Sequence, residues 1–214
     1  MRLSEFAQRE PIDAIMAETL SELWACRYGG AMRFSVDGPG QRWRAHDLLS
    51  AYFAPDLGRL GRTYLRDGFR NTPRRSRRAA QWLLGTMLAS NVGLRLSSRA
   101  AFHVEGDGPT ADLLIVPGNR RLRVLDFAQD RALVATKRGY DSESLSTELR
   151  VRSERSADFM VPVIEADPEA GWLEEPLLKG WCLPRAPRDH DQRASLQWAR
   201  DVVAQWAEPE RRSE

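Results

Sequence analysis

The stretch "ADLLIVPGNRRLRVLDFAQDRALVATK", residues 111–137, decides the fold that the sequence predicts. It opens with a short apolar run at 113–116, and "GNRR" after it is a turn signal. In the second run Leu122 and Val124 alternate with Arg123, which is the period of a strand with one buried face. The turn "AQD" then leads into a third run, "ALVATK". Together the three runs predict an antiparallel meander.

A helix and two more strands are expected after the meander. Asp141 or Ser142 can act as the N-cap of the helix, because a short side chain with an oxygen accepts hydrogen bonds from the first turn. Segments 159–167 and 171–178 are strand candidates, separated by the turn signal "DPEAG". The predicted fold class is therefore α+β, with a five-stranded antiparallel sheet and one packed helix.

The sequence divides into three predicted parts. Residues 1–105 are expected to form a mainly helical region, which begins with an amphipathic helix over 11–26 and contains an Arg-rich tract at 59–78. Residues 106–184 hold the predicted sheet, and residues 185–214 hold a C-terminal helix and tail. Smaller elements expected within these parts are a short strand at 31–36 and helices at 77–90 and 193–206.

The composition of the 214 residues is that of an ordinary soluble protein, with 42% apolar residues, 29% charged residues and a net charge of +2. No apolar run reaches the length of a membrane span, and the N-terminus lacks the apolar segment of a signal peptide. Cys26 and Cys182 match no metal-binding or redox spacing, as expected of idle thiols in a reducing compartment. We therefore expect a cytoplasmic protein without a transmembrane segment.

Lysine is rare in this chain, which makes the position after the third run informative. Of 32 Lys and Arg residues only Lys137 and Lys179 are lysines, and a compact ammonium does different chemistry from a guanidinium. Gly118 can adopt a positive φ and bring backbone N–H groups close to an anion, and Lys137 would reach over the sheet toward the same place. Glu148 on the following helix is the expected ion-pair partner of Lys137, with Glu143 as its competitor.

Residues 111–184 resemble the N-terminal lobe of the kinase-like superfamily, in particular the small-molecule branch of aminoglycoside and choline phosphotransferases. The segment "VPGNRRLRVLDF" stands for strand, phosphate loop and strand, and "ALVATK" takes the place of the kinase V-A-I-K strand. The segment "SESLSTELRVR" takes the place of the glutamate-bearing helix, and "FMVPVIEADPEAGWLEEPLLKGWCLP" is similar to the last two strands and the interlobe hinge. The loop has one glycine and two arginines, which departs from G-x-G-x-x-G.

The resemblance implies an ATP-binding lobe of a phosphotransferase that transfers phosphate from ATP to a hydroxyl group of an unidentified substrate. Lys137 would contact the α- and β-phosphates, Glu148 would orient Lys137, and main-chain groups of the hinge at 174–177 would meet the adenine. ATP would bind with Mg, whose ligands belong to a second lobe. The cofactor-binding residues that the resemblance implies are Gly118, Asn119, Arg120, Lys137, Glu148, Glu175 and Leu177.

The catalytic loop and the metal-binding aspartate of kinases have no counterpart in the sequence, so no catalytic residue and no metal ligand is expected in this chain. His190 and Asp191 lack the H-x-D spacing and follow the hinge too closely, and an aspartate there suits the N-cap of the last helix. Three interpretations are open: a fragment of a longer kinase-like protein, a natural stand-alone lobe, or a resemblance without a ligand. We expect this chain to be inactive in phosphoryl transfer.

The basic tract supports an alternative function of a different class. Residues 41–78 hold ten arginines against three aspartates, which is a local net charge of +7. A solvated surface is the simplest interpretation, and contact with phosphate or anionic lipid is the functional one. The alternative is a non-catalytic interaction module that docks an anionic partner through its Arg-rich tract. The spacing of Trp43, Tyr64 and Phe69 does not match a base-stacking platform, which argues against nucleic acid as that partner.

Overall fold

The computed structural model describes residues 3–30, 32–70, 83, 85–88, 90–106, 112–154, 161–178, 194 and 196–201. Within these residues the fold class is α+β, as predicted. The strands are β1 (Arg33–Ser35), β2 (Gln41–His46), β3 (Ala51–Phe53), β4 (Arg99–Glu105), β5 (Leu113–Pro117), β6 (Arg121–Asp126), β7 (Arg131–Thr136), β8 (Glu165–Asp167) and β9 (Trp172–Pro176). The helices that position the features below are α1 (Leu3–Ala7), α2 (Ile12–Tyr28), α3 (Arg59–Arg70), α5 (Asn91–Leu96) and α6 (Glu143–Glu154).

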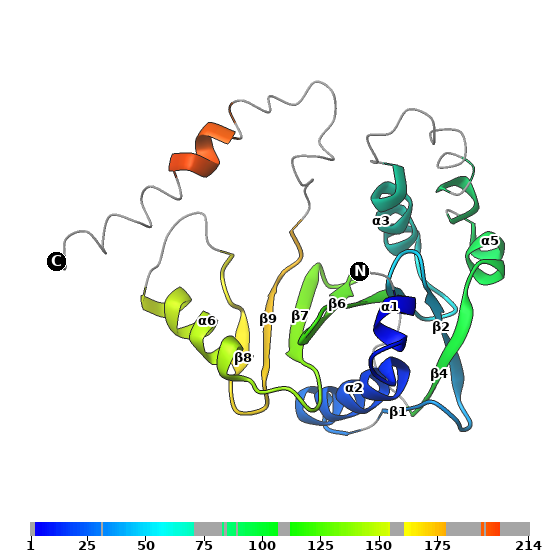
Figure 1. Ribbon diagram of the computed structural model, residues 1–214, viewed down its shortest axis with the longest axis horizontal. Coiled ribbons are helices and arrows are strands. Elements are labelled where there is room, and N and C mark those ends of the chain that lie inside the picture. The colour runs from blue at the N-terminus through cyan, green and yellow to red at the C-terminus, as the bar shows by residue number, and fades with distance from the viewer. Residues whose placement is uncertain are drawn as a thin grey trace.

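All nine described strands belong to one antiparallel sheet, in the order β1-β4-β2-β3-β5-β6-β7-β9-β8. Helix α6 lies beside β8 and β9 near one end of the sheet, and α3 and α5 lie near β2 and β4 toward the other end (Figure 1). Among the described residues, no helix combines the length and the apolar composition that a bilayer-spanning segment needs.

The prediction of a separate five-stranded sheet is wrong, because the sheet continues into the N-terminal part of the chain. Strand β3 pairs with β5, with Tyr52 opposite Ile115 and Phe53 opposite Leu114. Strands β1, β4 and β2 extend the sheet further on that side. The region 1–105 is therefore not only helical. Its strands are short or rich in arginine, so their apolar alternation is weaker than that of the meander.

The local elements predicted after residue 106 are confirmed within one or two residues for β5, β6, β7, α6 and β9. Strand β8 is shorter than the segment 159–167 that was predicted as a strand. The side chain of Asp141 accepts a hydrogen bond from the Glu143 N–H at 3.2 Å, so Asp141 caps the start of α6.

Two predictions for the N-terminal part are also confirmed. Helix α2 contains nearly all of the predicted segment 11–26, and it ends at Gly29, whose φ of 78° suits a glycine. The short strand predicted at 31–36 is β1. The helices predicted at 77–90 and 193–206 lie largely outside the described residues.

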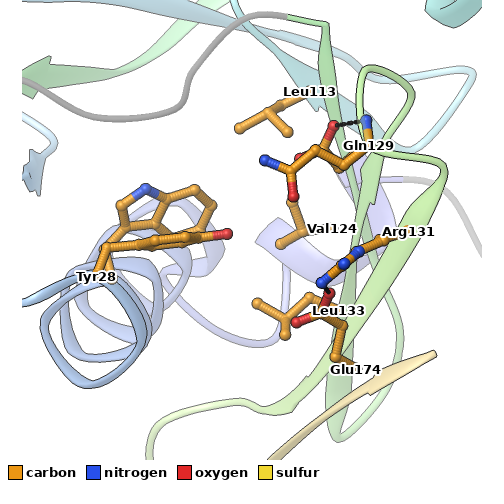
Figure 2. A pocket seen from close by; sticks show the side chains of 9 residues that line it. Tyr28, Leu113, Val124, Gln129, Arg131, Leu133 and Glu174 are labelled. Carbon is orange, nitrogen blue, oxygen red and sulfur yellow. Dashed lines mark hydrogen bonds and ion pairs between the residues drawn. The ribbon is translucent and has the colours of Figure 1, made fainter. Parts of the chain in front are cut away.

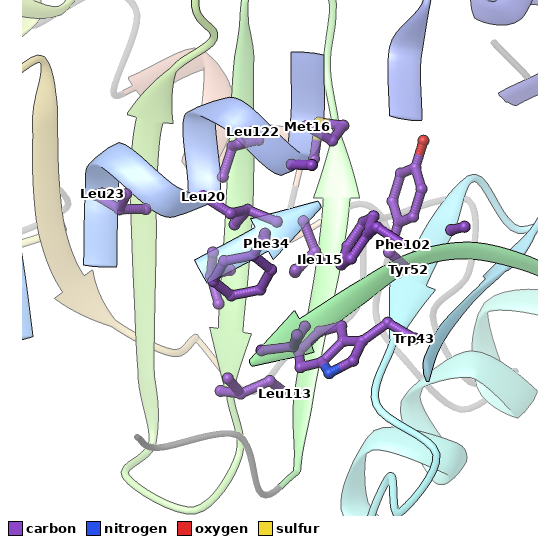
Figure 3. Close-up of a cluster of buried hydrophobic side chains, with 14 of the residues drawn as sticks. Met16, Leu20, Leu23, Phe34, Trp43, Tyr52, Phe102, Leu113, Ile115 and Leu122 are labelled. Atoms are coloured by element: carbon purple, nitrogen blue, oxygen red, sulfur yellow. The ribbon is translucent and has the colours of Figure 1, made fainter. Parts of the chain in front are cut away.

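The two faces of the sheet carry different helices. Side chains alternate along a strand, so neighbouring residues of one strand belong to different clusters. On one face, which we call the α2 face, Ile115, Leu122 and Leu133 pack with residues of α2 such as Leu20. Figure 3 shows Met16, Leu20 and Leu23 of α2 above the sheet residues, with Phe34, Trp43, Tyr52 and Phe102 extending the same cluster.

The opposite face, which we call the α6 face, has two smaller apolar clusters. Val134 and Leu173 pack against Leu145 of α6. Leu114 and Leu125 belong to a cluster that also includes residues of α3 and α5. Strand β7 is thus buried on both faces. The face to which a side chain of β7 or of the next residue points decides which helix it can contact.

Candidate functional site

Lys137 follows β7 and is completely buried, with 0% of its surface exposed. Its ammonium donates a hydrogen bond to Oε1 of Glu10 at 2.6 Å, and the Tyr140 hydroxyl donates to Oε2 of the same carboxylate at 2.9 Å. The rings of Phe6 and Tyr140 lie 5.2 and 5.0 Å from the ammonium, within the range of cation–π attraction. We call these four residues the Lys137 cage. It leaves the ammonium no open side for an external phosphate.

The Lys137 cage changes the ionisation of its carboxylate. Burial disfavours the charged form of Glu10, but the hydrogen bonds from Lys137 and Tyr140 and the charge of Lys137 oppose it. The net result is a pKa of Glu10 below its ordinary value. The cage is therefore an ion pair that favours the folded state at neutral pH.

The predicted ion pair between Lys137 and Glu148 is not formed. Leu133 and Ala135 belong to the cluster on the α2 face, whereas Val134 packs against α6 on the other face. Because side chains alternate, Lys137 follows Leu133 and Ala135 and points to the α2 face. Helix α6, with Glu148, covers the opposite face of the sheet. Lys137 and Glu148 are thus separated by the sheet itself.

Glu148 instead holds two arginines on the α6 face. Its two carboxylate oxygens form ion pairs with Arg121 and Arg152. Arg121 also donates to Oγ of Ser144 at 3.0 Å, and Arg152 also pairs with Glu175 at 2.9 Å. Burial opposes the ionisation of Glu148, but the hydrogen bond from Arg121 and the charges of both arginines lower its pKa. Glu148 is therefore the ion-pair partner of Arg121 and Arg152, and not of Lys137.

The turn between β5 and β6 was predicted as the phosphate loop. The N–H of Gly118 donates to the carbonyl oxygen of Arg121 at 2.7 Å, and a Cβ at Gly118 would lie 2.9 Å from that oxygen. The glycine therefore allows a close backbone approach, and it does not have the positive φ that we expected. Asn119 and Arg120 are exposed at the tip of this turn, and Arg123 is exposed on β6.

The predicted hinge at 174–177 lies within the sheet. The Glu174 carbonyl oxygen accepts a hydrogen bond from the N–H of Ile164 at 2.7 Å, and the Leu177 N–H donates to the carbonyl oxygen of Asp130 at 2.8 Å. The side chain of Glu175 points to the α6 face, where it pairs with Arg152. These backbone groups already have partners within the protein, so the structure does not present them to an adenine ring.

A small pocket lies between the end of α2 and the sheet (Figure 2). Tyr28 forms one side, and Leu113, Val124 and Leu133 form the apolar floor. Glu174 also lines the pocket, and its buried carboxylate pairs with Arg27 at 3.0 Å and with Arg131 at 2.6 Å. The cavity is small, with a volume of about 20 Å³. It opens on the α2 face and contains no residue of the turn between β5 and β6.

The sequence analysis missed Glu10 and Tyr140 as residues around Lys137, and it missed Arg121 as a partner of Glu148. A glutamate just before a helix carries no signal of a contact 127 positions further along the chain. Arg121 was detectable, because it is the last residue of "PGNRR" and starts the strand next to the lysine strand. Glu143, the competitor for Lys137, is exposed at the start of α6 and makes no ion pair with that lysine.

The chemistry that these residues offer is binding of an anion. Arginine presents several N–H donors in a plane that matches phosphate oxygens. Within the part of the chain that the structure describes, no group of three or more His, Cys, Asp or Glu side chains is arranged to hold a metal ion.

The fold and site define an α+β domain with a long antiparallel sheet and an arginine cluster beside one helix. Comparisons of the chain with protein-family models, with curated proteins and with solved structures found no match. The kinase-like resemblance therefore stays a prediction from the sequence motifs.

Proposed function

We propose that β5 to β9 and α6 form a kinase-like lobe that binds ATP through its phosphates at the turn between β5 and β6. The observation that carries the proposal is the contact of Glu148 with Arg121. Glu148, on the helix after the third strand of the meander, pairs with Arg121 at the start of β6, whereas the resemblance implied that it would orient Lys137. In this proposal Arg121 takes the role that the sequence analysis had assigned to Lys137.

The charges around the turn support phosphate binding. Arg120 and Arg123 are exposed on either side of Arg121, and no ion pair involving either is found among the described residues. Glu148 and Ser144 restrict the Arg121 guanidinium, so less conformational freedom is lost when phosphate binds. Arg121 and Arg123 are on the same side of β6 because side chains alternate along a strand, and their positive charges suit the negative charges of a nucleotide triphosphate.

Lys137 has a structural role in this proposal. Its ammonium is neutralised by Glu10 and enclosed by two rings, so it stabilises the junction between β7 and the N-terminal helices. The reaction that the resemblance implies is phosphoryl transfer from ATP to a hydroxyl group. None of the residues assigned here catalyses that step, and their proposed role is to hold phosphate oxygens.

Calorimetric titration of the full chain with Mg·ATP tests the proposal. We expect binding at submillimolar ATP, competition by tripolyphosphate, and an affinity at least tenfold lower in Arg121→Met, since one charged hydrogen-bonding partner contributes about 1.5–3 kcal/mol. Arg150→Met is the matched control, because Arg150 is an exposed arginine of α6 whose ion-pair partner is Glu154. No binding at millimolar Mg·ATP, or equal affinities in both variants, would refute the proposal. Loss of binding in a folded Lys137→Met variant would instead favour the original sequence prediction.

A further inference from the structure

Exposed apolar side chains gather on one part of the chain. Isolated exposed apolar residues are normal, but a group of them marks an interaction surface. Leu60 and Tyr64 stand one turn apart on α3, and Val92 and Leu96 stand one turn apart on α5, with Val92 68% and Leu96 77% exposed. Of the fourteen large apolar side chains that are exposed among the described residues, six lie in this part: Leu60, Tyr64, Leu83, Met87, Val92 and Leu96.

Arginines accompany these apolar residues on α3. Arg59, Arg62 and Arg66 recur at spacings of three and four, which places them along one stripe of the helix. Gly61 and Leu65 face the protein, and Leu65 packs in the same apolar cluster as Leu94 of α5. Helix α3 therefore has a buried side, an arginine stripe and an exposed apolar edge. Helices α3 and α5 are anchored to one cluster and do not depend on a partner for their own packing.

We propose that α3 and α5 dock this protein onto the surface of an anionic lipid bilayer. Arg59 and Arg66 would contact lipid phosphates, whereas Arg62 donates a hydrogen bond to the carbonyl oxygen of Leu57, and Leu60, Val92 and Leu96 would enter the boundary between headgroups and acyl chains. Basic helices with an exposed apolar edge bind membrane surfaces in this way, by apolar burial together with attraction to anionic lipids.

The shape of the surface favours a lipid over a folded acidic partner. A partner helix needs an apolar groove in which to lie. The apolar side chains named above on α3 and α5 are instead exposed to solvent, and the pocket described above lies elsewhere, between α2 and the sheet. Protruding apolar groups suit a soft surface that closes around them. This proposal does not depend on ATP binding.

Co-sedimentation with vesicles tests the proposal. We expect binding to phosphatidylcholine vesicles that contain phosphatidylserine, weak binding to pure phosphatidylcholine, and a decrease as salt screens the charges. One arginine near an anionic surface raises the affinity for vesicles about fivefold, so Arg59→Gln with Arg66→Gln should lower that affinity by roughly 25-fold. Arg33→Gln with Arg42→Gln is the matched control, because it removes the same charge from exposed positions of β1 and β2.

A second pair of variants isolates the apolar contribution. Leu60→Asn with Leu96→Asn leaves the charge unchanged, and we expect it to weaken vesicle binding while binding to soluble heparin stays the same. Absence of vesicle binding overturns the proposal, as does equal weakening in the Arg33 and Arg42 control. Full vesicle binding by the Leu60 and Leu96 variant also overturns it. Binding to heparin or polyglutamate but not to vesicles would indicate a soluble acidic partner in place of the membrane.

Discussion

The ammonium of Lys137 lies 2.6 Å from the carboxylate of Glu10, although the two residues are 127 positions apart in the chain. This contact joins the end of β7 to the start of α2 and places a charged pair beneath the rings of Phe6 and Tyr140. A buried charge is tolerated only when it is paired and hydrogen-bonded. The pair therefore makes the position of the N-terminal helices depend on the central sheet.

Removal of the carboxylate should destabilise the protein strongly. Glu10→Gln leaves a fully buried ammonium without its counterion, and breaking such a pair costs about 3–5 kcal/mol. The measurement is the free energy of unfolding in urea at pH 7. Glu22→Gln is the control, because Glu22 pairs with Arg138 where both side chains are 55% exposed, and it should cost less than about 1 kcal/mol. Equal decreases in the free energy of unfolding of the two variants would show that the Lys137 ammonium is not buried away from solvent.

Stability should decrease in acid, partly through Glu10 and Glu148. Both carboxylates have a pKa below the ordinary value in the folded protein. Such groups contribute stability above their unfolded pKa and lose it as pH falls through their folded pKa. We expect the free energy of unfolding to fall as pH decreases below about 4.5, and to fall less steeply in Glu10→Gln. Parallel pH profiles for the wild type and the variant would contradict this assignment.

The coupling energy between Arg121 and Glu148 should be larger than that of an exposed ion pair on α6. A double-mutant cycle with alanine at both positions is expected to give about 1 kcal/mol, because the side chains are only 25% and 32% exposed. The cycle for Arg150 and Glu154, which are mostly exposed, should give at most about 0.5 kcal/mol. The readout is again urea unfolding. Indistinguishable coupling energies would mean that Glu148 does not orient Arg121.

Gly40 should be intolerant of a side chain. Its φ is 109°, and a Cβ there would lie 2.3 Å from the carbonyl oxygen of Val104 on the neighbouring strand. Gly40→Ala should therefore cost more than about 2 kcal/mol, from strain and steric overlap together. Gly30 also has a positive φ, of 84°, but a Cβ there meets nothing within 4 Å. Gly30→Ala should cost about 1–2 kcal/mol. Comparing the Tm of the two variants separates the steric overlap from the strain. Equal decreases in Tm would contradict the close approach of Gly40 to the Val104 carbonyl oxygen.

Much of the local structure was predictable. The alternation of Leu122, Arg123 and Val124 indicated β6 correctly, and the turn signals around it indicated β5 and β7. The helix after the meander was also predictable from its cap and its apolar residues. The extension of the sheet through β3 was not, because a three-residue strand such as Ala51–Phe53 carries too little pattern to separate it from a loop.

The partners of the charged residues were predictable only in part. Strand β7 is apolar on both sides, since Leu133 and Ala135 are buried on one face and Ala132 and Val134 on the other. Because apolar residues occur on both sides of β7, its sequence does not reveal which helix covers which face of the sheet. The sequence analysis paired Glu148 with Lys137, whereas the partners of Glu148 are Arg121 and Arg152 and the partner of Lys137 is Glu10.

The sequence by itself determined, to within one or two residues, where the strands of the meander and helix α6 lie, because apolar periodicity, turns and caps act over a few residues. Only the tertiary structure decided that Lys137 meets Glu10 and that Arg121 meets Glu148. The physical reason is that a sheet separates its two faces. The direction of a side chain follows from its place along the strand, whereas the identity of its partner depends on which distant helix packs on that face.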